Sequence, residues 1–403
     1  MTAMIAEAET NARPAPAWLE RLRSGAAVRA RCSAVYDWVA AGHSPYFVLD
    51  QGKLEAAADY VASICRANYP ALDIPYHSRW RHFVVGGVDR WSLLKPQFKD
   101  AQARLKAAFD LAFVSVLLDA GAGETWRYRD PSSGAVLARS EGLAIASFEM
   151  FRSGAFSNDT SDPLRVDGAA LRRLSDDALA RHFQVAAANP LAGLSQRVAL
   201  LRRLGEAISG RIGDMTGGFG HDVSAAQLLA SLLRSMQMIW PDALVVEGQA
   251  VGDAGFHDAV RAGDGSGRIV PFHKLTQWLT YSLIEPLQDA GYRVTDLDQL
   301  TGLPEYRNGG LFLDLGVIAL KNPEDSARPH AVSSPQVVEW RALTVTLLDR
   351  LLPLVRSRLG LDEAFALPHL LQGGTWAAGR KIAAERRPGG PPPLKLVLGG
   401  SIF

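Results

Sequence analysis

The spacing of apolar residues along the chain predicts a protein built mainly from α-helices. After Asp50, apolar residues recur every three or four positions from Leu54 to Cys65, until Pro70 interrupts the pattern. A second predicted helix runs from about Lys99 to Leu118, and its middle is apolar on all sides, as in a central, buried helix. Similar spacing predicts helices at 16–41, 142–152, 171–184, 194–209, 224–239, 274–290, 335–359 and 369–386, with Pro353 kinking or dividing the helix at 335–359.

Few segments carry the alternating pattern of β-strands. Two short runs around Asp130-Pro-Ser-Ser-Gly predict a β-hairpin near 125–139. The segment 387–403 begins as a Pro- and Gly-rich linker and continues with Leu394-Lys-Leu-Val-Leu, which predicts a short C-terminal strand. Because strands and helices do not alternate, the pattern argues against a Rossmann or TIM-barrel fold. We expect a flexible tail at 1–16 and a single helical domain at 17–403.

Composition limits the partners of this chain. Hydrophobic residues make up 48% and charged residues 21%, which is typical of a soluble globular protein. The 43 basic and 42 acidic residues nearly cancel, so a global attraction to nucleic acid is not expected. The longest apolar run, near Leu111–Leu118, is shorter than the ~18 residues that cross a bilayer. The two cysteines, Cys32 and Cys65, cannot form a disulfide framework or a multi-cysteine zinc site. We expect a cytoplasmic protein whose oligomeric state stays open.

The first candidate site is the segment 73–91, which mixes cations with aromatic residues. His77, Arg79 and Arg81 stand among tyrosine, tryptophan and phenylalanine side chains. Guanidinium groups bind phosphate or carboxylate in a bidentate manner, and aromatic rings can wall a pocket. A solvated basic loop, with its aromatic residues plugging the core, would have the same composition. Both interpretations stay open.

The second candidate site surrounds a Gly-rich turn at 262–267. Phe256 and Asp258 precede the turn, and Lys274 follows it. A carboxylate and a lysine in this arrangement could be a nucleophile or base with its electrostatic partner. On residue types alone, an ordinary ion pair is the favoured interpretation.

Two further segments place acids next to cations. Glu305, Tyr306 and Arg307 precede two glycines, which either let the backbone approach a ligand closely or end a helix. Glu339 and Arg341 lie two positions apart on a predicted helix and therefore point to different faces. If one of these charged side chains points into the protein interior, it needs a partner of opposite charge.

Longer motifs in these segments resemble a known family. Ile74-Pro-Tyr-His-Ser-Arg-Trp-Arg-His-Phe, Leu303-Pro-Glu-Tyr-Arg-Asn-Gly-Gly and Gly373-Gly-Thr-Trp-Ala-Ala-Gly-Arg are similar to segments of the fourth component of the URC pathway of uracil catabolism. Leu117-Leu-Asp-Ala-Gly-Ala-Gly and Ala138-Arg-Ser-Glu-Gly-Leu match it as well, and the similarity extends over nearly the whole chain from about residue 20. The resemblance implies a role in a pathway that opens a uracil nucleotide and releases urea from a ribosylurea-type intermediate.

A second resemblance, to the queuosine-salvage nucleotide glycosidases, concerns mechanism. Four short pieces of that family have counterparts here in the same order: Phe256-His-Asp, Lys274-Leu-Thr-Gln, Leu303-Pro-Glu-Tyr-Arg and Val338-Glu-Trp-Arg-Ala. The family's aspartate is replaced by Glu305 and its Val-Pro by Asn-Gly, so the pocket need not accept the same base. The resemblance implies N-glycosidic bond cleavage, and we expect a DNA-glycosylase-like helical body.

Together the two resemblances imply an N-glycosidase that releases urea and ribose, or ribose phosphate, from a ribosylurea-type substrate. Departure of urea leaves an oxocarbenium-like sugar that a carboxylate stabilises, while an acid or cation assists the leaving group. We expect Asp258 beneath the anomeric carbon and Glu305 as the second acid, or the two acids in exchanged roles, with Lys274 as the cation that fixes a carboxylate or phosphate. The expected substrate-binding residues are His77, Arg79, Arg81, Phe256, Tyr306, Arg307, Glu339 and Arg341.

Two other functions compete with this hypothesis. The first is a non-catalytic protein that binds a pathway nucleotide and regulates or scaffolds its neighbours. The second is an amidohydrolase acting on the ureide carbonyl, which usually needs a metal or an activated nucleophile. Cys65 lies on an apolar helix face, and the histidines lack close metal-ligand spacing. We expect no metal and no cofactor. The expected partner is a small nucleoside- or nucleotide-derived substrate, and neither nucleic acid nor a membrane is expected to bind.

Overall fold

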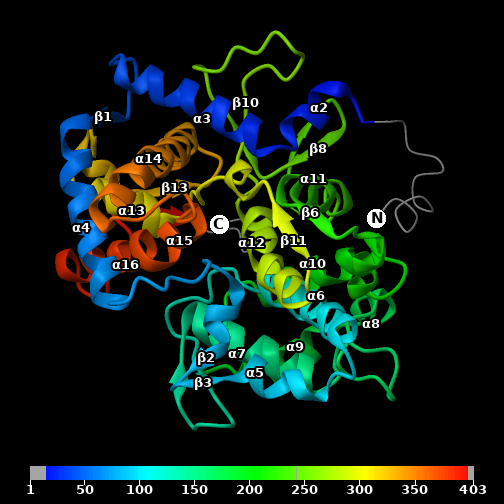
Figure 1. Cartoon of the computed structure of the whole chain (residues 1–403). Coiled ribbons are helices and arrows are strands. Elements are labelled where there is room, and N and C mark those ends of the chain that lie inside the picture. The colour runs from blue at the N-terminus through cyan, green and yellow to red at the C-terminus, as the bar shows by residue number, and fades with distance from the viewer. Residues whose placement is uncertain (1–14, 242, 398–403) are drawn as a thin grey trace.

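A computed structural model describes residues 15–241 and 243–397, and fifteen helices dominate this part of the chain (Figure 1). Helices hold 54% of the residues, which confirms the predicted mainly α class. The helices are α2 (Ala17–Leu22), α3 (Gly25–Ala40), α4 (Leu54–Asn68), α5 (Arg90–Leu94), α6 (Ala101–Leu117), α7 (Arg139–Arg152), α8 (Gly168–Arg172), α9 (Asp176–His182), α10 (Leu194–Ala207), α11 (Ala225–Ser235), α12 (Lys274–Asp289), α13 (Tyr306–Asp314), α14 (Pro335–Leu359), α15 (Leu367–Leu370) and α16 (Trp376–Arg386).

The strands of the described residues form seven separate two-stranded sheets. The antiparallel pairs are β1 (Phe47–Leu49) with β12 (Ile318–Leu320), β2 (Val84–Val85) with β3 (Val88–Asp89), β4 (Tyr128–Arg129) with β5 (Val136–Leu137), β7 (Leu244–Val246) with β8 (Gln249–Gly252), and β9 (Ala254–Phe256) with β10 (Ile269–Pro271). The parallel pairs are β6 (Asp222–Ser224) with β11 (Arg293–Thr295) and β13 (Pro329–Ala331) with β14 (Lys395–Val397). The predicted hairpin near 125–139 corresponds to β4 and β5, and the C-terminal strand to β14, whereas 398–403 lies outside the described residues.

Several predicted helices are divided where a side chain caps a new helix. The segment 16–41 is two helices, because the Ser24 hydroxyl accepts a hydrogen bond from the Ala27 amide and starts α3. Ser175 does the same for α9, so the segment 171–184 is also divided. In contrast, Pro353 does not divide α14, which is continuous. The proline lies on the exposed face of α14, where water can reach the carbonyl group that it leaves without a donor.

Helix α12 lies in the middle of the molecule. Figure 1 shows α3, α4, α13, α14 and α16 on one side of it, and α6, α10 and α11 on the other. One hydrophobic cluster joins buried residues from Tyr36 to Leu394 and includes most of these helices. The first residue of α12, Lys274, therefore lies near the junction of the two groups of helices.

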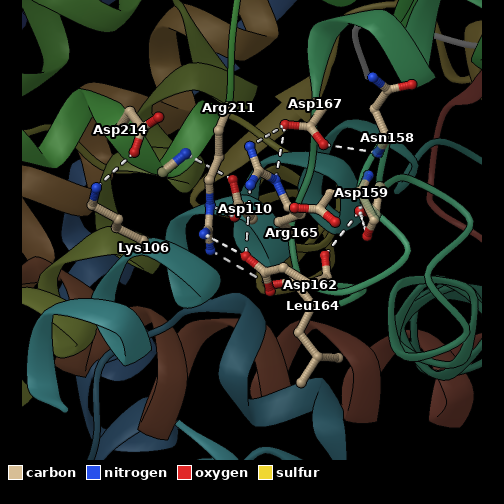
Figure 2. Close-up of polar contacts among 12 residues, drawn as sticks. Lys106, Asp110, Asn158, Asp159, Asp162, Leu164, Arg165, Asp167, Arg211 and Asp214 are labelled. Atoms are coloured by element: carbon tan, nitrogen blue, oxygen red, sulfur yellow. Dashed lines mark hydrogen bonds and ion pairs between the residues drawn. The ribbon is translucent and has the colours of Figure 1, made fainter. Parts of the chain in front are cut away.

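A buried polar network holds the loop 156–167 and the segment after α10 against α6 (Figure 2). The carboxylate of Asp110, in the middle of α6, accepts hydrogen bonds from Arg211 Nε and from the Gly213 amide, both at 2.7 Å. Arg211 also contacts Asp162 at 3.3 Å, and Arg165 pairs with Asp167 at 2.7 Å. Burial raises the pKa of Asp110 to about 7, although Arg211 opposes this shift. The network fixes the helix whose C-terminal end contributes to the site described below.

Helix α13 is held close to its neighbours by glycines. A side chain at Gly309 would collide with Trp340 and Thr344 of α14, at 2.7–2.8 Å. A side chain at Gly379 of α16 would lie well inside van der Waals contact of the carbonyl group of Arg307. Glycine at these positions lets the backbones approach and so sets the position of Glu305 to Arg307.

We predict that Gly379→Ala destabilises the protein by about 1–3 kcal/mol, because the added methyl group must push α16 away from the Arg307 carbonyl. Gly217→Ala is the matched control, since nothing lies within 4 Å of the position of its added methyl group. Urea denaturation of the two variants would measure the effect. Equal stability of both variants would contradict the close-packing argument.

Candidate active site

The candidate site lies where the ends of several helices meet. Glu305 is the N-cap of α13, and its carboxylate accepts a hydrogen bond from the Asn308 amide at 3.2 Å. The predicted loop 305–310 is therefore the start of a helix. Within it, Gly309 packs against α14 and Gly310 lies against Pro393. Lys274 is the first residue of α12, and Asp119 follows the C-terminal end of α6.

Lys274 is the cation at the centre of this arrangement. Burial lowers the pKa of Lys274, and the Glu305 carboxylate opposes this shift more strongly than Asp253 or Asp119 does. Burial in turn raises the pKa of Glu305, while Arg307 and Lys274 act in the opposite direction. The two side chains keep partial access to solvent. They form a coupled acid and base of the kind that proton-transfer sites contain.

Asp253 fixes the start of α12 and thereby Lys274. Its carboxylate oxygens each accept a hydrogen bond from Arg341 of α14 at 2.8 Å, and one also accepts from the Lys274 amide at 2.9 Å. Its carbonyl oxygen accepts from the amides of Phe272 and His273 at 2.9 and 3.1 Å. His273 has a φ of 51°, a left-handed conformation that costs energy in a non-glycine residue. This strained turn directs Lys274 towards Glu305.

Three buried polar atoms near the site have no hydrogen-bond partner among the described residues. They are Arg79 Nη2, His82 Nδ1 and Trp278 Nε1. Arg79 is fully buried. Its Nε donates a hydrogen bond to the Ser115 hydroxyl at 2.7 Å, and its Nη1 donates one to the Asp119 carboxylate at 2.8 Å. The ring centre of Trp278 lies 5.5 Å from the Arg79 guanidinium and 5.9 Å from the ring centre of His82. Unpaired buried donors are costly, so this group is suited to hold a polar ligand.

His77 and Arg307 belong to the same region. The Nδ1 atom of His77 lies 3.1 Å from Gln372, and its ring centre lies 6.1 Å from that of Trp376. Burial lowers the pKa of His77 to about 4, and the charge of Arg307 adds to this shift. Arg307 lies 4.7 Å from the Trp376 ring centre and 5.4 Å from that of Tyr306. The structure thus brings together His77, Arg79, Lys274, Glu305, Tyr306 and Arg307, and links Arg341 to them through Asp253.

Asp258 is not part of this group. Its side chain is 71% exposed and forms an ion pair with Arg268. The register of the β9–β10 hairpin explains the difference, because Ala254 pairs with Pro271 and Phe256 with Ile269. Lys274 follows β10 at one end of the hairpin, where Asp253 precedes β9. Asp258 follows β9 at the opposite end.

Three other predicted binding residues also lie outside the group. Phe256 is 43% exposed near Asp258. Arg81 pairs with Glu285 of α12 at 2.5 Å. Glu339 is fully buried and contacts the Ser44 hydroxyl and, at 3.0 Å, Nε2 of His257. Glu339 therefore ties the loop before β1 and the segment after β9 to α14.

The sequence interpretation missed Asp119, Asp253, Trp278 and Trp376. Asp119 and Trp376 lie within the family-like motifs, so the signal was present but no role was given to them. To identify Asp253 from the sequence, the pairing register of the β9–β10 hairpin would have had to be known. Trp278 is one turn after Lys274, which places both on the same face of α12.

The two cysteines are poor nucleophiles. Both side chains are buried, and burial raises the pKa of Cys65 to about 12 and that of Cys32 further still. In the described part of the chain, no three His, Cys, Asp or Glu side chains are grouped so that they could hold a metal ion. Across the same residues, we find no helix with the length and apolar character that a membrane crossing requires.

The fold is that of a mainly helical protein, and the candidate site combines charged side chains with aromatic rings. The chain belongs to the DUF1688 family, which is described as a protein of unknown function and matches residues 21–403. It is 42% identical over 374 residues to Protein urg3 of Schizosaccharomyces pombe, covering 89% of this chain and 92% of that protein. It is 37% identical over 431 residues to Uracil catabolism protein 4 of Lachancea kluyveri, covering 94% of this chain and 98% of that protein. These matches confirm the family resemblance drawn from the motifs.

Buried His77 makes stability depend on pH. Its folded-state pKa of about 4 lies below the ordinary 6.5, so the unfolded chain binds the proton first as the pH falls. We predict that the free energy of unfolding decreases between pH 6.5 and 4, and that His77→Gln removes on the order of 3 kcal/mol of this decrease.

Urea denaturation at pH 7 and pH 4 measures the effect. His43→Gln, a change at an exposed histidine, serves as the control and should leave the pH dependence as it is in the unaltered protein. The burial argument fails if the His77 variant loses as much stability on acidification as the His43 variant.

Proposed function

We propose that this protein is a hydrolase of uracil catabolism that cleaves the N-glycosidic bond of a ribosylurea-type intermediate and releases urea. The observation that carries the proposal is that two carboxylates, Glu305 at the start of α13 and Asp119 after α6, both act on the charge of Lys274 at the start of α12. The name of the relative from Lachancea kluyveri supports the pathway. The helical architecture is compatible with a DNA-glycosylase-like body, and the whole of 17–403 would form one catalytic domain.

The two carboxylates would take different roles because their surroundings differ. Glu305 keeps only partial access to solvent and its pKa is raised by burial, so it can hold a proton nearer neutral pH and donate it to the departing urea nitrogen. Asp119 is ion-paired with Arg79 at 2.8 Å and would stabilise the positive charge that develops on the sugar. A carboxylate in this role either attacks the sugar or orients a water molecule.

The cations and aromatic rings would position the substrate. Lys274 would hold Glu305 in place and stabilise it after it has given up its proton. The unpartnered Arg79 Nη2 and Trp278 Nε1 are donors that suit the carbonyl oxygen of a ureide. Arg341 would act indirectly, since it positions Asp253 and through it the backbone of Lys274.

We predict that Glu305→Gln and Asp119→Asn each reduce turnover of ribosylurea or its 5′-phosphate by about 10²-fold or more, because each removes a group needed in the transition state. Asp258→Asn, the exposed alternative carboxylate, should keep turnover within about threefold of the unaltered protein. Free urea and reducing sugar, followed together, provide the measurement.

The outcomes separate the competing functions. Equal release of urea and sugar, lost in the Glu305 variant, supports the glycosidase. Ammonia without free sugar would indicate hydrolysis of the ureide. Binding without any product would favour a regulatory or scaffold protein, and loss of activity in Asp258→Asn alone would move the catalytic centre to the far end of the β9–β10 hairpin.

A further inference from the structure

Three arginines converge beside the candidate active site, on the side of Trp376. The guanidinium groups of Arg307 and Arg380 lie 4.7 and 5.7 Å from the Trp376 ring centre. Arg139, at the start of α7, reaches the same region through a hydrogen bond to the carbonyl group of Gly389, the neighbour of Gly390 in the cavity wall. We call Arg139, Arg307 and Arg380 the arginine cluster.

The acids around the arginine cluster do not balance its charge. Glu141 pairs with Arg380 at 2.9 Å. Asp314 is held by Arg387 in a bidentate pair with both distances at 2.6 Å. Arg307 is buried, and the acid that acts on its charge is Glu305, two positions earlier, which also interacts with Lys274. The three arginines therefore outnumber the two carboxylates, Glu141 and Glu305, that act on them, and the exposed Arg139 and Arg380 leave the surplus positive charge open to an anion.

The local backbone and the C-terminal segment shape this region. Arg139 has a φ of 54°, a strained conformation in a non-glycine residue, and it donates a hydrogen bond to the Gly389 carbonyl at 3.3 Å. The residues that line a small cavity here include Tyr306, Arg307, Arg380, Gly390, Pro393 and one acid, Asp314, whose charge is paired with Arg387. The Pro- and Gly-rich segment thus forms one wall beside the arginines.

We propose that the arginine cluster binds the phosphate group of a phosphate monoester substrate, with Trp376 as the platform beneath Arg307 and Arg380. The proposal rests on the proposed function and narrows its substrate to a phosphorylated sugar. Arg307 is two positions after Glu305 in the first turn of α13, so the phosphate would lie close to the reacting centre. Guanidinium groups match the geometry of phosphate oxygens, and three of them suit a dianion.

The test compares binding of ribose 5-phosphate, inorganic phosphate and ribose by isothermal titration calorimetry. We expect ribose 5-phosphate to bind and ribose not to bind measurably. Arg139→Gln and Arg380→Gln should each raise the Kd of ribose 5-phosphate about tenfold. Both side chains reach solvent, so these variants are expected to fold. Lys381→Gln is the matched control, because Lys381 is the next residue on α16 and faces Glu385 at 3.9 Å.

The binding and cleavage results either support or contradict the phosphate site at the arginine cluster. The phosphate site is supported if both arginine variants bind ribose 5-phosphate more weakly and Lys381→Gln binds it as the unaltered protein does. If inorganic phosphate binds more weakly than ribose 5-phosphate, the site is one for the phosphate ester. Equal binding of ribose and ribose 5-phosphate, or arginine variants that bind like the unaltered protein, would overturn it. If the binding pattern holds but ribosylurea 5-phosphate is not cleaved, the phosphate site stands and the proposed function fails. Cleavage of ribosylurea and its 5-phosphate at equal rates would contradict the phosphate site alone.

Discussion

The bidentate pair between Arg341 and Asp253 is the interaction on which the site depends. It joins α14 to the turn before α12, and the same carboxylate accepts a hydrogen bond from the Lys274 amide. Burial alone would raise the pKa of Asp253, but Arg341 and the surrounding donors lower it. Removing either partner would leave a buried charge uncompensated, which costs several times more than losing a surface pair. The position of Lys274 therefore depends on a contact made well outside its own helix.

Close helix packing supplies the second constraint. Glu305 can face Lys274 only because α13 lies tightly between α14 and α16, and the glycines at 309 and 379 make that approach possible. On the other side, the buried Asp110 network holds α6, whose end carries Asp119. Thus the charged groups of the site lie on rigid elements, as pre-organised electrostatic stabilisation requires.

Much of the helical framework could be predicted from local pattern. The helices α4, α6 and α12 follow from apolar spacing and from the residues that end them, because both signals are local in sequence. The helix α13 was not predicted, since two adjacent glycines normally indicate a loop, and only the packing of Gly309 against Trp340 and of Gly310 against Pro393 explains them. Asp258 and Asp253 are five residues apart, and choosing between them required the register of β9 against β10. Such pairing is decided by tertiary contacts rather than by composition.

The most direct test of the central claim uses ribosylurea 5-phosphate labelled with ¹³C at the urea carbonyl. We predict that ¹³C NMR detects intact labelled urea together with free ribose 5-phosphate, and that Glu305→Gln forms both more slowly, by about 10²-fold or more. Labelled bicarbonate with ammonia would show that the bond broken is in the ureide, and would contradict the assignment of Glu305 and Asp119 to an N-glycosidase.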